Sequence, residues 1–237
     1  MKKKFSIIFI LVLFLLQAKL MIPDDANFAF LLGVQIAGNT KMVSDELMYW
    51  LLPIIALTFY FSGFIRDSLS KYGFLYIIRG ISRIRWWIQK IVVAICTVII
   101  FILLQLLIFY MMTDTTIDTT STEFIGLVIQ YFLMLMTLIF IQLTCELFIE
   151  SNVAHLIITL YIVSSVLIAH IIYPFVPSNQ YFWLFLPLNG MGANTGVAML
   201  NSISALISTQ VAISVLFISM VAVFILSIVK VKKIDIF

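Results

Sequence analysis

The chain has few charged residues and few cysteines, and each shortage excludes a class of protein. Only 11% of its 237 residues are charged, whereas 63% are hydrophobic, and the mean hydropathy is +1.18. A water-soluble protein of this length needs charged residues at about a quarter of its positions to cover its surface. The two cysteines, Cys96 and Cys145, lie in different apolar runs. The sequence therefore excludes an ordinary soluble domain and gives no sign of a disulfide framework.

Six long apolar runs fill the chain. A bilayer core is about 30 Å thick, so a helix with a rise of about 1.5 Å per residue needs roughly 20 residues to cross it. Lipid offers no hydrogen-bond partner to the backbone, and no strand alternation suggests a barrel, so we expect helices. The fold class is then all-α, a polytopic membrane protein forming a single transmembrane domain over 1–237. The expected spans are approximately 5–21, 46–65, 91–112, 124–149, 153–176 and 207–229.

The basic residues predict the orientation. Of the 14 lysines and arginines, 12 lie at the N-terminus, in the loop 66–90 or at the C-terminus. The segments between them carry mainly aspartate and glutamate. By the positive-inside rule, both termini should be cytoplasmic. The first run follows Lys2, Lys3 and Lys4 like a signal peptide, but Leu16 stands where a cleavage site needs a small residue, so an uncleaved anchor is favoured.

Chemistry on the chain itself has little support. No phosphate-binding glycine loop, nucleophile elbow or metalloprotease motif is present. His155 and His170 on one helix would lie about 22 Å apart, too far to share a metal. Glu146 and Glu150 with His155 could in principle hold a metal, but hydrogen-bonded interface residues are the favoured interpretation. We expect no catalytic residue, cofactor, metal or nucleic-acid partner, and any energy for transport should come from another subunit.

The loop 66–90 holds six of the basic residues, interleaved with isoleucine and aromatic residues. On a helix, Arg79, Arg83 and Lys90 would form one stripe. One interpretation is an interfacial helix whose arginines bind anionic headgroups, at about 1 kcal/mol each. The other is a docking element for a cytosolic partner. The two are compatible.

The segment 177–206 is the second unusual connection. Its start is too apolar for a solvated loop and too short to span, which favours an interfacial or re-entrant helix at the outer leaflet. It could be a lid over the bundle or part of an exit gate, with Tyr181, Trp183 and Phe185 as gate candidates. The run Gly190, Gly192 and Gly196 is interpreted as a turn or helix break.

Together these parts resemble the membrane subunit of an ABC-2 type transporter. The stretch Ile78-Arg-Gly-Ile-Ser-Arg-Ile-Arg-Trp-Trp-Ile-Gln-Lys90 is similar to the basic-aromatic run that small bacterial permeases of this kind carry before their third span. The resemblance implies a coupling helix in the loop 66–90, on a cytosolic ATP-binding subunit, and a second permease chain as partner. The coupling surface that it implies consists of Arg79, Arg83, Arg85, Trp86, Trp87 and Lys90.

The function implied is export of an amphipathic peptide, antibiotic or lipid-like substrate from a bacterial plasma membrane, in contact with membrane lipids. The long outer segment 22–44 departs from the family pattern and leaves room for a specialised role. Two alternatives remain open: a non-transporting binding or immunity protein, and the substrate-capturing subunit of a vitamin importer. Either would bind a small ligand without an ATPase.

Overall fold

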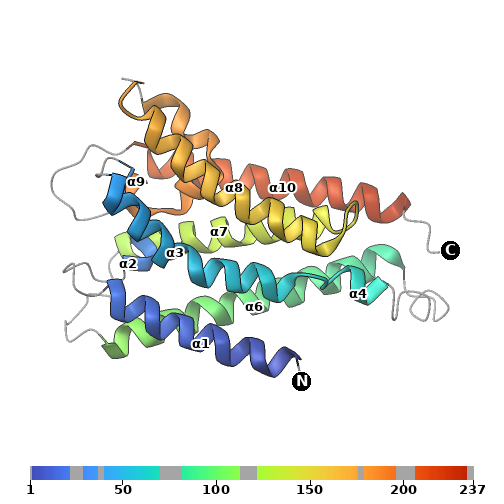
Figure 1. The fold of residues 1–237 in the computed structure, drawn as a ribbon. Helices are drawn as coiled ribbons and strands as arrows, with labels where there is room; N and C mark the ends of the chain where they lie inside the picture. Colours follow the sequence, from blue (N-terminus) through green and yellow to red (C-terminus); the bar gives the residue numbers. More distant parts are fainter. Residues whose placement is uncertain are drawn as a thin grey trace.

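The computed structural model describes residues 2–21, 29–36, 40–69, 82–112, 122–175, 179–195 and 206–233. Regular structure in these ranges is entirely helical (Figure 1). Six helices have 20 to 30 residues each. They are α1 (Lys2–Met21), α3 (Thr40–Phe61), α6 (Arg83–Met112), α7 (Thr122–Cys145), α8 (Ser151–Ile172) and α10 (Thr209–Lys233).

Five of these helices are long and apolar enough to cross a membrane. They cover Val43–Ser68, Arg83–Met112, Glu123–Cys145, Ser151–Ile172 and Thr209–Lys233. In α1, the described stretch Ile10–Leu20 is apolar but shorter than a spanning helix. The prediction of a helical membrane protein is therefore confirmed, and each of the predicted spans two to six overlaps one of these helices.

Side-chain contacts give the relative directions of two pairs of long helices. Phe14 meets Phe101, and one turn further Gln17 meets Gln105, so α1 and α6 run in parallel. Gln142 of α7 donates to the carbonyl of Thr58 in α3, and one turn further Glu146 accepts from Gly63, so α3 and α7 are a second parallel pair. The start of α1 and the end of α10 lie at the same end of the bundle (Figure 1). We call it the basic end, because the described bases of α4, α6 and the last turn of α10 gather there.

The third long helix begins earlier than predicted. The span was placed at 91–112, after a separate coupling loop, but α6 is continuous from Arg83. Ser82 caps it, accepting a hydrogen bond at its Oγ from the backbone N–H of Arg85 (3.3 Å). Residues 83–90 of the predicted loop are thus the first two turns of α6. Helix α7 ends at Cys145, not at the predicted residue 149, and a turn leads from it to α8.

The opposite end is closed by short helices, and we call it the cap end. α2 (Ala29–Leu32) packs against α7 and α9 (Gly192–Thr195). Two 3-10 helices, η3 (Asn179–Leu184) and η4 (Leu186–Gly190), precede α9, and η4 packs against α7, α8 and α10. The predicted outer segment 177–206 is therefore only partly interfacial, because Pro187 to Gly192 are buried in the bundle.

Asn194 joins the two parts of the cap. Its side-chain amide donates to the carbonyl of Val34 (2.9 Å) and accepts from the N–H of Ile36 (3.4 Å). Its own carbonyl accepts from the N–H groups of Leu206 and Ile207. A single buried asparagine thus satisfies backbone groups of two segments that form no regular ladder.

Candidate functional site

At the basic end, the Glu146 carboxylate anchors the turn that follows α3. It accepts hydrogen bonds from the backbone N–H groups of Gly63 (2.9 Å) and Ile65 (3.2 Å). Gly63 has φ +79°, a left-handed conformation that ends α3 and that a side chain would strain. The side chain of Glu146 is only 4% exposed. The chain leaving α3 for α4 (Arg66–Ser68) is thereby fixed to the end of α7.

Burial raises the pKa of Glu146 above its usual range. The N–H donors of Gly63 and Ile65 oppose that shift, because they favour the charged form. A second tie is weaker: Arg66 pairs with Glu150 at 3.7 Å, with the two side chains 51% and 73% exposed. The three acid and imidazole groups considered as a metal site do not gather. Within the described ranges, no group of three or more His, Cys, Asp or Glu residues could hold a metal ion.

The predicted coupling residues divide into buried and exposed members. Arg79 lies outside the described residues. Trp86 and Trp87 are both buried against other helices of the chain, and their predicted place on a coupling surface stays a prediction. Trp87 donates from Nε1 to Ser227 Oγ of α10 (2.9 Å). Tryptophan rings next to basic residues are typical of both membrane interfaces and helix contacts, and here tertiary packing selects the second.

The three described bases of this set lie at the surface or near it. Arg83 donates from Nη1 to the carbonyl of Lys232 (3.0 Å), which satisfies one of the last carbonyls of α10. Arg85 is exposed. The ammonium of Lys90 lies 4.7 Å from the ring centroid of Phe64 and 5.9 Å from that of Trp86.

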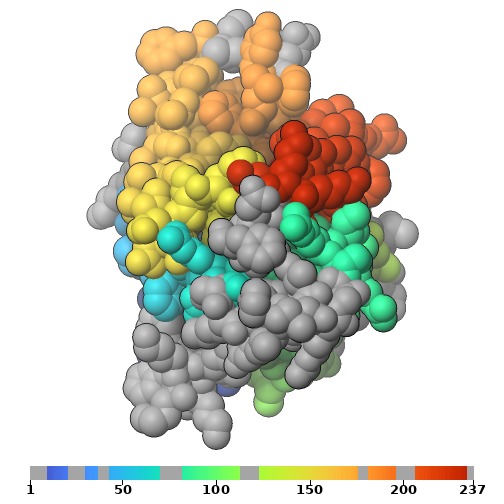
Figure 2. Space-filling view, turned by 90° about the vertical axis from the view of Figure 1, so that its right-hand side faces the viewer, coloured from blue at the N-terminus to red at the C-terminus, as the bar shows by residue number. Residues whose placement is uncertain are grey.

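Figure 2 views the basic end directly. The end of α10 lies between the α7–α8 turn and the start of α6. Two contacts account for this position: Lys230 lies over the ring of Phe148 at 4.5 Å, and Arg83 bonds to Lys232. The last turn of α10 therefore contacts both the α7–α8 turn and the start of α6 at the basic end.

Of the predicted gate residues, Tyr181 and Trp183 lie on η3 of the cap end, and Phe185 lies between η3 and η4. Tyr181 and Trp183 are exposed and Phe185 is half-buried, whereas Phe182 between them is buried against Tyr173. Asn189 Nδ2 holds the segment by donating to the carbonyls of Trp183 and Phe185. The two predicted histidines are also placed: His170 Nδ1 lies 2.9 Å from the carbonyl of Ile36, and His155 meets Phe59 edge-on.

A set of buried glutamines was not predicted from the sequence, because they carry no charge and lie within apolar runs. All four lie in long helices and are nearly or completely buried: Gln17, Gln105, Gln130 and Gln142. Gln105 is the centre of a chain of bonds: it donates to Gln17 Oε1 and accepts from the Tyr131 hydroxyl. Amides inside apolar runs were a visible signal, since such side chains often hydrogen-bond between membrane helices.

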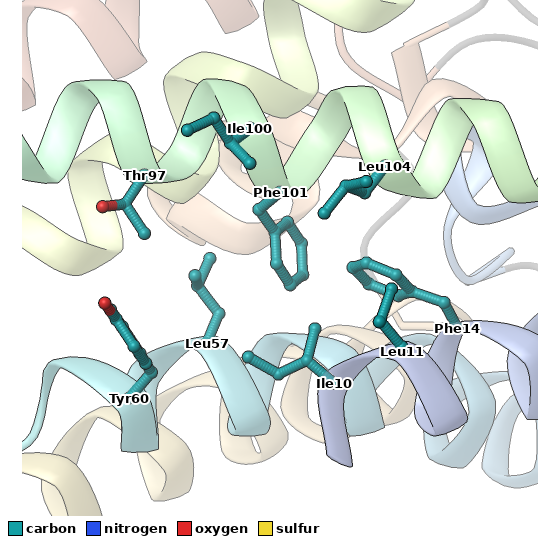
Figure 3. Close-up of a pocket in the computed structure, with 9 residues that line it drawn as sticks. All are labelled: Ile10, Leu11, Phe14, Leu57, Tyr60, Thr97, Ile100, Phe101 and Leu104. Carbon is teal, nitrogen blue, oxygen red and sulfur yellow. The ribbon is translucent and has the colours of Figure 1, made fainter. Parts of the chain in front are cut away.

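An apolar groove of about 230 Å³ lies between α1, α3 and α6 (Figure 3). At one end, the rings of Phe14 and Phe101 meet edge to face at 4.8 Å. The hydroxyls of Tyr60 and Thr97 lie at the other end, nearer the basic end of the bundle. The wall between is hydrocarbon, from residues Ile10, Leu11, Leu57, Ile100 and Leu104. The groove offers shape and van der Waals contact, with almost no hydrogen bonding.

These helices define the class as a helical protein embedded in a membrane. The chain belongs to the family described as "Protein of unknown function (DUF2705)", whose model matches residues 6–237. It is similar to the "Uncharacterized protein YybK" of Bacillus subtilis (strain 168), at 29% identity over 215 residues, 88% of this chain and 86% of that protein. No solved structure matches it significantly.

Proposed function

We propose that the chain is the membrane-spanning permease subunit of an ATP-driven exporter of the ABC-2 type, in a bacterial plasma membrane. In this proposal α1 is a sixth span, because the helix has 20 residues and runs beside α3 and α6. The basic end is cytoplasmic by the positive-inside rule, which puts both termini on that side. A cytosolic ATP-binding subunit and a second permease chain complete the transporter.

The observation that carries the proposal is how the connection between α3 and α6, which we call the basic connection, is attached to the bundle at both ends. On the side where it leaves α3, Glu146 holds the turn at Gly63 and Ile65. On the side where it enters α6, Trp87 bonds to Ser227 and Arg83 to Lys232, both in α10. A force on this connection would thus reach α7 and α10 as well as α3 and α6. Attachment at both ends suits a segment that passes motion from a cytosolic subunit to the spans.

In this proposal the contact with that subunit involves only some of the coupling residues. Trp86 and Trp87 would fix the helix from inside, while exposed Arg85, with Arg79, would meet the partner. Because Arg83 donates to the Lys232 carbonyl of α10, reversing its charge would also remove a hydrogen bond within the chain. The cargo would be amphipathic, because the spans carry buried amides but few charges. Tyr181 and Trp183 would stand at its outer exit.

Co-purification in mild detergent from the native host tests the proposal. We expect an ATP-binding subunit to accompany the tagged chain and its ATPase activity to depend on the chain. Arg79→Glu with Arg85→Glu should remove the subunit. The matched control is Lys232→Glu with Lys233→Glu, which reverses two charges at the same end but outside the connection. Retention of the subunit in the first variant would refute the docking role.

A chain that purifies without any ATP-binding subunit, and binds a small ligand tightly in detergent, would contradict the permease function. That result would favour a binding or immunity protein or a vitamin-capturing subunit instead. Isothermal titration against candidate ligands distinguishes these outcomes.

A further inference from the structure

We propose that the groove between α1, α3 and α6 binds one acyl chain of an anionic phospholipid, with its headgroup phosphate beside Lys90. This inference goes beyond the permease function and does not depend on it. The site would be occupied whether or not the chain transports anything.

The lining of the groove excludes water and most ligands. A stable buried water needs two to four polar partners, and the groove supplies two hydroxyls, both at one end. At about 230 Å³, it is also smaller than the roughly 300–1,000 Å³ of pockets that take drug-sized molecules. Left empty, the walls would lose dispersion contacts along their whole length. A segment of a single hydrocarbon chain fits this volume, restores those contacts and needs no polar partner.

The groove opens where lipid is available. Neighbours of its lining residues on α1 and α6 are exposed apolar side chains, among them Leu15, Ile99 and Leu103. These residues belong to the surfaces that would face the bilayer. An acyl chain of the surrounding bilayer would therefore enter the groove from the side.

Charge at the basic end specifies the headgroup. Lys90 lies seven residues before Thr97 on α6, so it shares that face of the helix about 10 Å closer to the basic end. On the facing wall, Phe64 follows Tyr60 by four residues, and the Lys90 ammonium lies over the Phe64 ring. A cation thus lies beyond the hydroxyl end of the groove, about two turns further along α6. An ammonium near the headgroup level attracts an anionic lipid by about 1 kcal/mol.

Photolabelling of the full chain tests the site. The chain is reconstituted in vesicles of phosphatidylethanolamine with phosphatidylglycerol that carries a diazirine on one acyl chain, and labelled peptides are mapped by mass spectrometry. We expect labels on groove residues of α1, α3 and α6. Leu104→Trp fills the groove, and the matched control Leu103→Trp makes the same change on the exposed neighbour. Labelling of the groove should fall in the first variant alone.

The headgroup is tested by replacing labelled phosphatidylglycerol with labelled phosphatidylcholine. Wild-type chain should prefer the anionic lipid, and Lys90→Gln should lower that preference roughly fivefold. Lys230→Gln, a cation of the same end on α10, should not. Leu57→Phe blocks the groove from the opposite wall and serves if Leu104→Trp does not fold, as judged by size exclusion. Equal labelling in the two tryptophan variants, or equal labelling by both lipids in wild type, would overturn the proposal.

Discussion

The carboxylate of Glu146 accepts a 2.9 Å hydrogen bond from the backbone N–H of Gly63, 83 residues earlier in the chain. The bond joins the end of α7 to the turn after α3, at the point where the basic connection leaves the bundle. Gly63 is in a left-handed conformation, and its buried N–H donates to this side chain. A buried carboxylate supplies the acceptor that the turn needs.

Removing this carboxylate should destabilise the chain. Glu146→Ala leaves the N–H groups of Gly63 and Ile65 buried without this acceptor, so we expect a loss of about 2–4 kcal/mol in the free energy of unfolding. Glu150→Ala is the matched control, since it breaks only an exposed ion pair and should cost less than about 1 kcal/mol. Thermal unfolding in detergent measures both. Equal losses would show that the anchor is not specific.

The stability of the chain should also depend on pH through Glu146. Burial raises its pKa, so the folded chain holds a proton that the unfolded chain releases between the two pKa values. This contribution is complete below the unfolded pKa, near 4.3, and is lost as pH rises through the folded pKa. We expect the Tm of wild type to fall relative to that of Glu146→Gln as pH rises over this interval. A relative rise would contradict the direction of the shift.

The glutamine pair should couple α1 to α6. Gln105→Leu removes the donor to Gln17 Oε1, while Gln17 Nε2 keeps its bond to the Tyr49 carbonyl. Gln17→Leu removes the acceptor of Gln105 Nε2, while Gln105 Oε1 keeps its bond from Tyr131. The double variant removes both amides, so its loss should be smaller than the sum of the single losses by about 0.6–2 kcal/mol. Gln210→Leu, an exposed position on α10, should have little effect. Additive losses in the double-mutant cycle would exclude the coupling.

A further test concerns the packing of the cap against α7. A Cβ on Gly190 would lie 2.4 Å from the Cβ of Met134, so Gly190→Ala requires η4 to move away from α7. We expect a loss of about 1–3 kcal/mol. Gly126→Ala is the control: nothing lies within 4 Å of its added Cβ, and alanine should stabilise α7 by up to about 1 kcal/mol. Unfolding curves of the two variants should therefore shift in opposite directions.

Much of the fold was predictable because hydropathy is a property of chain segments. Spans two to six were placed within a few residues at most ends, with the larger errors where α3 and α6 begin. The start of α6 was not predictable, since a basic-aromatic run is compatible with an interfacial helix and with the first turns of a span. Only the contacts of Trp87 with Ser227 and of Arg83 with Lys232 separate the two.

The candidate site was less predictable than the fold. Glu146 was considered for its spacing to Glu150 and His155, but its partners are backbone groups of a distant turn, and no sequence pattern marks them. The groove is formed by α1, α3 and α6, which meet only in the folded bundle. The buried glutamines could have been recognised as polar residues within spans, although not their pairing.

The sequence by itself determined that this protein is a bundle of apolar helices, and it concentrated the bases in one connection. These are consequences of composition, because lipid excludes unpaired backbone and the helix is the local solution. Tertiary structure alone decided which polar side chains meet, where Trp86 and Trp87 point and where an apolar groove remains. Those outcomes depend on the rotation and depth of each helix against its neighbours, which packing sets and hydropathy leaves undetermined.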